Sequence, residues 1–145
     1  MLRDELAQAL AAFANTTIAT LRETLGIEAT FRGYSLDGDA SPRITVAIEA
    51  TGDLRRVTWV FPVELARELA RRMTGEADAA LEALAAIELA NILTGRGAAT
   101  LERCGLRIEL APPHITSEVP PGASVRLVTE VGAIEIVLEL HRMAA

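Results

Sequence analysis

A weak internal repeat is the feature that most constrains how this chain can fold. Residues 20–27 read TLRETLGI, and residues 100–106 read TLERCGL. Each segment is followed by a strand-like stretch, a proline-containing connection and a hairpin pattern. Because helix, strand and hairpin occur twice in the same order, the sequence predicts a duplicated α+β domain. Its two pseudo-symmetric halves would form an antiparallel-rich sheet with the helices packed on one face.

The boundaries of the elements follow from apolar periodicity and from the positions of Gly and Pro. Helices are expected at residues 4–25, 62–73 and 76–94, with a further helical turn or two at about 98–104. Strands are expected at residues 27–36, 43–51, 54–61, 106–111, 124–131 and 133–141, with a loop at 37–42. Gly95-Arg-Gly97 is interpreted as a C-terminal break in the third helix. Trp59 and Met73 are expected in the core.

Length and composition limit the possible classes of function. The chain has 145 residues, half of them apolar, which suits one ordinary domain over residues 1–145. No apolar run approaches the length of a membrane span. The formal net charge of −6 and the 3% aromatic content argue against nucleic acid as a partner. A single cysteine and a charged, helix-like N-terminus favour the cytoplasm.

The helix expected at residues 76–94, called the motif helix below, carries a carboxylate and a carboxamide three residues apart, Glu88 and Asn91, on one face. Asn is a poor residue for a helix interior, and Glu is rarely buried unpaired. Helical spacing puts Leu81 and Leu84 on the same stripe as this pair. A different face gathers small residues that allow close packing, namely Ala79, Ala83, Ala86 and Ala90.

Two interpretations of this stripe follow from the residues alone. It could be a second packed face, with Glu88 paired to a basic side chain and Asn91 bonded to a neighbouring backbone. It could instead be an exposed stripe that docks on a partner, where Leu81 and Leu84 supply apolar contact and the polar pair supplies the chemistry. The sequence contains no metal-ligand cluster, phosphate loop or serine-nucleophile motif.

Residues 86–95, AIELANILTG, resemble the Glu-x-x-Asn signature of the CheC/CheX family of phosphatases, which act on phosphorylated chemotaxis response regulators. The flanking parts are also similar: a hairpin with a Phe-Pro exit, a helix closing on Met-x-Gly, and a strand ending in a Pro turn. Their order is closer to CheX than to the longer CheC. Ile87 and Ser117 stand where CheX-like chains often carry Gly. CheC has a second motif on its first helix, and the comparable place here, residues 12–15, lacks the Glu.

The resemblance implies one CheX-like domain that hydrolyses the aspartyl phosphate of a CheY-like receiver domain. A carboxamide can hold water in line with phosphorus, which is the expected role of Asn91. Glu88 would repel a phosphoryl dianion, so it is expected to pair with a receiver cation, which the resemblance suggests is the lysine beside the phosphorylation site. The phosphorylated regulator would supply Mg²⁺, and the protein would need no cofactor of its own.

The family resemblance also implies a homodimer that pairs through its sheets. Two alternatives to a phosphatase remain open. One is a non-catalytic receiver-binding or structural module of the same fold, like the family's relatives among flagellar switch proteins. The other is a dimerisation or ligand-sensing domain in which Glu88 and Asn91 form a hydrogen-bonding unit near the helix end.

Overall fold

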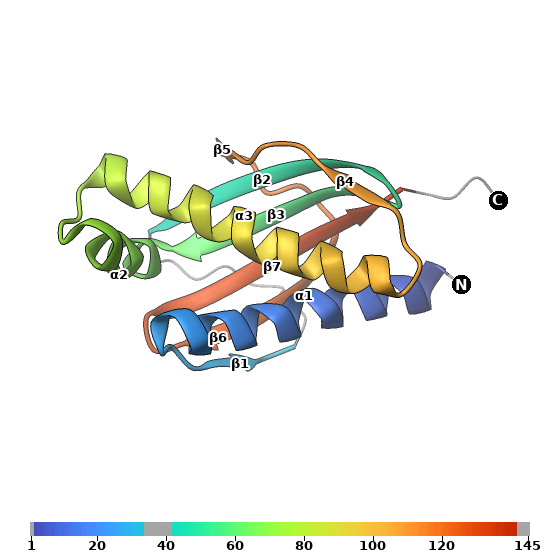
Figure 1. Cartoon of the computed structure of the whole chain (residues 1–145), viewed down its shortest axis with the longest axis horizontal. Helices are drawn as coiled ribbons and strands as arrows, with labels where there is room; N and C mark the ends of the chain where they lie inside the picture. Colours follow the sequence, from blue (N-terminus) through green and yellow to red (C-terminus); the bar gives the residue numbers. More distant parts are fainter. Residues whose placement is uncertain (1, 34–41, 142–145) are drawn as a thin grey trace.

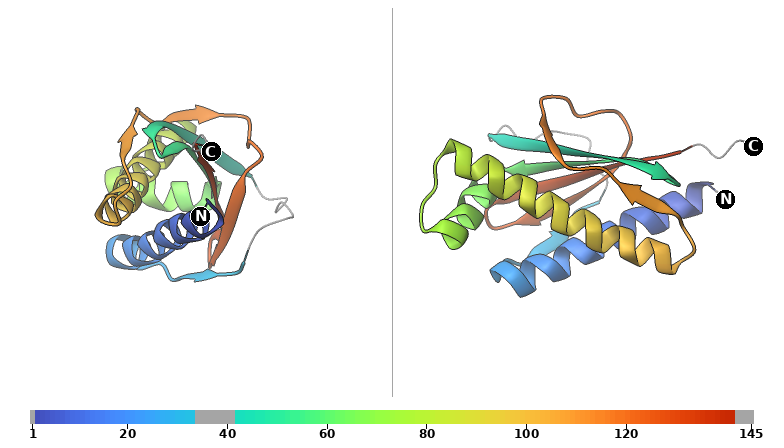
Figure 2. Two further views of the ribbon diagram at one scale, coloured as in Figure 1. Left: turned by 90° about the vertical axis from the view of Figure 1, so that its right-hand side faces the viewer. Right: turned by 45° about the horizontal axis from the view of Figure 1, so that its top comes forward.

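The computed structural model describes residues 2–33 and 42–141, and within them three helices lie on one face of a seven-stranded sheet (Figures 1 and 2). The helices are α1 (Leu2–Leu25), α2 (Val63–Thr74) and α3 (Ala79–Arg103). The strands are β1 (Ala29–Phe31), β2 (Arg43–Gly52), β3 (Leu54–Pro62), β4 (Ile108–Leu110), β5 (His114–Thr116), β6 (Ala123–Thr129) and β7 (Gly132–Leu140). The predicted loop at 37–42 and the end of the first predicted strand fall almost entirely outside the described residues.

The sheet has the order β1-β6-β7-β3-β2-β4, every pairing is antiparallel, and β5 pairs with the free part of β2. Strands β1, β2 and β3 of the first half correspond to β4, β6 and β7 of the second half. If each strand is replaced by its counterpart and the order is read from the opposite end of the sheet, the order is unchanged. The short edge strand of each half pairs with the hairpin of the other half: β1 with β6, and β4 with β2. The predicted α+β fold of two pseudo-symmetric halves is therefore confirmed. Among the described elements, α2 and β5 belong to one half only.

An aromatic cluster joins the helices to the inner face of the sheet. Trp59 of β3 stacks on Phe61 with ring centroids 5.7 Å apart and meets Phe13 of α1 edge-on at 6.2 Å. Its indole Nε1 donates a hydrogen bond of 2.8 Å to Thr94 Oγ1 of α3. Trp59 is fully buried, as expected, and it ties both long helices to the middle of the sheet.

The prediction of a break at Gly95–Gly97 is wrong, because α3 is one helix of 25 residues that runs through both glycines. Gly97 is buried where α1 crosses α3, and a Cβ placed on it would lie 2.6 Å from Phe13 Cδ1 and Cε1. Glycine at this position allows the two helices to approach closely. That packing offsets the roughly 1 kcal/mol by which an interior glycine disfavours a helix relative to alanine.

The ends of the other helices follow local signals in the sequence. Gly75 caps α2 in the left-handed conformation with φ of 83°, and its N–H donates to the carbonyl of Arg71. Asp78 begins α3, since its side chain accepts a hydrogen bond of 2.9 Å from the backbone N–H of Leu81. This cap moves the start of the motif helix three residues later than the sequence pattern predicts.

Candidate functional site

Glu88 and Asn91 both lie exposed on the outward face of α3. Within residues 2–33 and 42–141, neither side chain has a hydrogen bond or an ion pair with the rest of the protein. The expectation that the two are solvent-accessible on one helix face is confirmed. The interpretation of the stripe as a second packed face with internal polar partners does not fit.

The opposite face of α3 explains why the pair points outward. Ala86, Ala90 and Leu93 are fully buried against the sheet and α1. The hydrogen bond from Trp59 to Thr94 holds the helix one turn after Asn91. Glu88 and Asn91 therefore stand on a helix whose rotation and position are fixed from beneath, which favours a precise polar geometry on its outer surface.

The two leucines of the predicted stripe differ in their environment. Leu84 is 60% exposed, one turn before Glu88. Leu81 is only partly exposed and packs against the core, because it lies in the first turn of α3, which α2 flanks. Leu84 is therefore the member of the pair whose surface is largely open to a partner.

An apolar groove beside Glu88 is a feature that the sequence did not predict. It lies between the three helices and has a volume of about 310 Å³. Apolar side chains line most of it, together with the polar Thr20, Thr24, Glu88 and Arg96; the apolar residues are Leu21, Leu25, Leu69, Met73, Leu89 and Ile92. The expectation that Met73 lies in the core is wrong: it is 54% exposed, in the last turn of α2 beside this groove.

Arg96, which lines the groove, and Arg67 of α2 are both bound to other parts of the protein. Arg96 Nη1 donates a hydrogen bond of 3.0 Å to Thr20 Oγ1 of α1, and it lies 3.9 Å from Glu23 Oε2. Arg67 of α2 bonds Glu82 of α3 at 3.0 Å and also pairs with Glu64. The pKa of Arg67 is raised, mainly by the hydrogen bond to Glu82 and to a lesser extent by the negative charges of Glu64 and Glu82. These cations fix the helices to one another and leave the Glu88 carboxylate open to an external cation.

The burial pattern of α1 matches that of α3 with a shift of 80 residues. Ala9, Leu10, Phe13, Ala14, Thr17 and Leu21 of α1 are buried, and so are Leu89, Ala90, Leu93, Thr94, Gly97 and Leu101 of α3. In this register the counterparts of Glu88 and Asn91 are Gln8 and Ala11, both exposed. The comparable place on α1 is therefore residues 8–11 and not residues 12–15, and it carries neither the carboxylate nor the asparagine.

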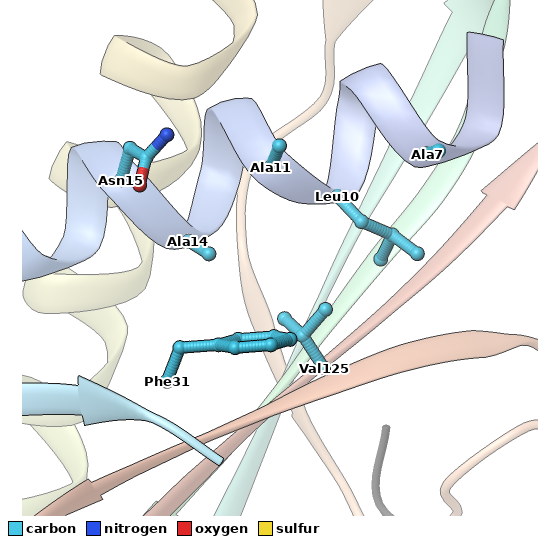
Figure 3. A pocket seen from close by; sticks show the side chains of 7 residues that line it. All are labelled: Ala7, Leu10, Ala11, Ala14, Asn15, Phe31 and Val125. Atoms are coloured by element: carbon cyan, nitrogen blue, oxygen red, sulfur yellow. The ribbon is translucent and has the colours of Figure 1, made fainter. Parts of the chain in front are cut away.

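A second hollow, of about 270 Å³, lies beneath α1 (Figure 3). Leu10 of α1, Phe31 of β1 and Val125 of β6 point toward one another across it. Three alanines of α1 complete its roof, and Asn15 borders it. Apart from Asn15 its lining is apolar, and none of the lining residues is ionisable, so it offers packing surface and little chemistry.

The described residues contain no group of three or more His, Cys, Asp or Glu side chains placed to hold a metal ion. No helix in the described part of the chain is long and apolar enough to cross a membrane. The arrangement on α3 therefore offers hydrogen bonding, charge and apolar contact to whatever it binds.

Solved structures share this fold over nearly the whole chain. The chemotaxis protein CheX from Desulfovibrio desulfuricans aligns with a TM-score of 0.73 at 18% identity, covering 92% of this chain and 99% of that one. A chain of the CheX–CheY–BeF3–Mg²⁺ complex from Borrelia burgdorferi aligns at 0.70 and 16% identity, covering 91% and 97%. The FliM middle domain from H. pylori aligns at 0.66 and 9% identity, covering 93% and 91%.

No protein-family model matches the sequence, and no curated protein sequence matches it significantly. The likeness at these identities is one of fold: the chain has the CheX/CheC fold, which the FliM middle domain shares.

Proposed function

We propose that this protein docks on a phosphorylated CheY-like receiver domain and accelerates the hydrolysis of its aspartyl phosphate. The observation that carries the proposal is that Glu88 and Asn91 are exposed and have no partner among the described residues, one turn apart on a helix that is fixed from beneath. The CheX fold of the chain adds support, because a solved structure holds CheX together with CheY, BeF3 and Mg²⁺. Because receiver domains act in the cytoplasm, this activity would be cytoplasmic.

Asn91 is the residue proposed to act on the attacking water. Its carboxamide offers a donor and an acceptor, so it can bind a water molecule and orient a lone pair toward phosphorus. It is neutral and does not repel the phosphoryl group. Holding the water in line converts a rare encounter into a positioned attack, and most of the catalysis of phosphoryl transfer comes from such positioning and from charge stabilisation.

Glu88 is proposed to set the register of docking. A carboxylate with no cation among the described residues of its own chain gains most from a cation on the partner. A receiver lysine beside the phosphorylation site would satisfy it and bring Asn91 over the phosphoryl group. Leu84 and the apolar groove beside Glu88 would supply the apolar part of the contact.

The chemistry of charge neutralisation belongs to the partner in this proposal. Mg²⁺ bound by the phosphorylated receiver would stabilise the phosphoryl oxygens. This protein contributes the position of the water and the docking contacts, and it needs no metal of its own.

The direct test is the rate of phosphate loss from a panel of phosphorylated CheY-like receiver domains, with and without this protein. We expect acceleration of at least one receiver. Asn91→Ala should remove most of it, a loss of about 10²-fold, while binding is largely kept. Glu88→Lys should reduce both binding and rate. Full activity of Asn91→Ala on a responsive receiver would refute the role given to Asn91.

The second candidate function is a non-catalytic module that binds a receiver domain or has a structural role. The likeness to the FliM middle domain favours it. It predicts binding of the activated receiver with no change in the rate of dephosphorylation, so the same assay separates the two functions.

A homodimer is a further part of the proposal. The sheet ends in the three-residue strands β1 and β4, each of which exposes a large apolar side chain, Phe31 and Leu110. Pairing of sheet edges between two copies would cover these edges and leave both α3 helices free. Light scattering at micromolar concentration should give twice the chain mass of 15.5 kDa, and the mass of one chain would reject the dimer.

A further inference from the structure

Gly95 is an exposed glycine in the interior of α3, and nothing in the described fold requires it there. Its backbone is helical, so an alanine would adopt the same conformation without strain. A Cβ placed on it would meet no atom within 4 Å among the described residues. Glycine is a poor helix residue, so its presence weakens α3 and gains no internal packing.

Gly97, two residues later, is a glycine that packing requires. It is buried, and a Cβ on it would press against the ring of Phe13 at 2.6 Å. The two glycines are therefore present for different reasons. The side chain missing at Gly97 makes room for α1, whereas the one missing at Gly95 makes room on the outside of the protein.

The space left open by Gly95 lies over Asn91. Gly95 follows Asn91 by four residues, so the two positions are stacked on the same face of the helix. Helical side chains lean toward the N-terminus and cover the turn before their own Cα. Any side chain at position 95 would therefore extend toward the carboxamide of Asn91 and occupy the space in front of it.

We propose that Gly95 is a positioning residue that keeps the space in front of Asn91 free, so that the phosphorylated loop of a receiver domain can contact the helix there. This inference rests on the proposed function, since it concerns how the same partner reaches Asn91. The occupant is the phosphoryl-bearing loop, because a neutral carboxamide can hold water against phosphorus only if the two lie within about one water diameter of each other.

The test compares Gly95→Ala and Gly95→Leu, because alanine and leucine have nearly the same helix propensity but differ in size. Both should raise the melting temperature, by about 3 °C. The rate of receiver dephosphorylation should fall with side-chain size, by about threefold for Gly95→Ala and about tenfold or more for Gly95→Leu. Ala79→Leu, which adds a leucine at an exposed position in the first turn of α3 on a different face from Glu88 and Asn91, is the matched control and should keep the wild-type rate.

A role for Gly95 in helix flexibility predicts a different result, namely equal losses for alanine and leucine. That result, or wild-type rates for Gly95→Leu, would overturn the inference. Affinity for a receiver domain activated by beryllium fluoride and Mg²⁺ provides a second readout. If the wild-type protein binds this probe without accelerating hydrolysis, the proposed catalysis is refuted. Weaker binding by Gly95→Leu would then still support the role of Gly95, and unchanged binding would overturn it. If the wild-type protein does not bind it, both ideas are refuted.

Discussion

The hydrogen bond from Trp59 Nε1 to Thr94 Oγ1 holds the motif helix to the sheet, and we expect its removal by Thr94→Val to destabilise the protein measurably. Both residues have 0% exposure. Valine has nearly the shape of threonine, so the substitution removes the acceptor and leaves the packing almost unchanged. The indole N–H would then be buried without its partner.

The size of the effect follows from that orphaned donor. A buried polar group that loses its partner costs about 1–3 kcal/mol. Helix propensity adds little, because threonine and valine are nearly equal in a helix. Taking the middle of the range, about 2 kcal/mol, and a denaturant dependence near 2 kcal/mol per molar urea, the unfolding midpoint should fall by about 1 M.

Trp59 provides the assay, since it is the only tryptophan in the chain. Urea unfolding followed by its fluorescence gives the midpoint for the wild type, for Thr94→Val and for Thr94→Ser. Thr94→Ser keeps the hydroxyl and loses one methyl group, so it should cost only about 1 kcal/mol. If Thr94→Val is as stable as the wild type, or more stable than Thr94→Ser, the hydrogen bond does not hold α3 as argued.

Two further predictions concern α3. Gly97→Ala should lower stability by about 1–3 kcal/mol, because its Cβ would overlap the Phe13 ring, while Gly95→Ala should raise it; equal shifts in thermal unfolding would contradict this contrast. Leu84→Glu should change stability by less than about 0.5 kcal/mol because Leu84 is exposed, yet it should weaken binding to the activated receiver in a titration; unchanged affinity would remove Leu84 from the docking surface.

The hairpins, and the buried and exposed faces of the motif helix, could be predicted because the sequence signals for them are local. Alternation along β7 assigns Ile134, Ile136 and Leu138 to the inner face, and all three are fully buried. The exposure of Glu88 and Asn91 follows from the spacing of small and apolar residues along one helix. Neither inference needs knowledge of what packs against the element.

Other features depend on partners far away in the chain, and periodicity does not report them. The sequence of α3 contains two glycines that resemble a helix end, and only the crossing of α1 at Phe13 explains why the helix continues. Long-range packing also explains Leu81 and Met73. Leu81 packs against the core because α2 flanks the first turn of α3, whereas Met73, in the last turn of α2, lies beside the groove. Strand β5 pairs with the part of β2 that β4 does not cover, a long-range contact that periodicity does not report.

The exchange of edge strands between the halves determines when this domain can become stable during synthesis. Ala29 pairs with Thr129, so β1 leaves the ribosome long before its neighbour exists. Loop closure over such a distance contributes to slow folding, and the apolar face of α1 must wait for it. We therefore expect that neither half folds alone, because each lacks the hairpin with which its edge strand pairs. A chain cut between α2 and α3 should therefore yield two fragments that stay unstructured separately and assemble when mixed, as two different subunits would.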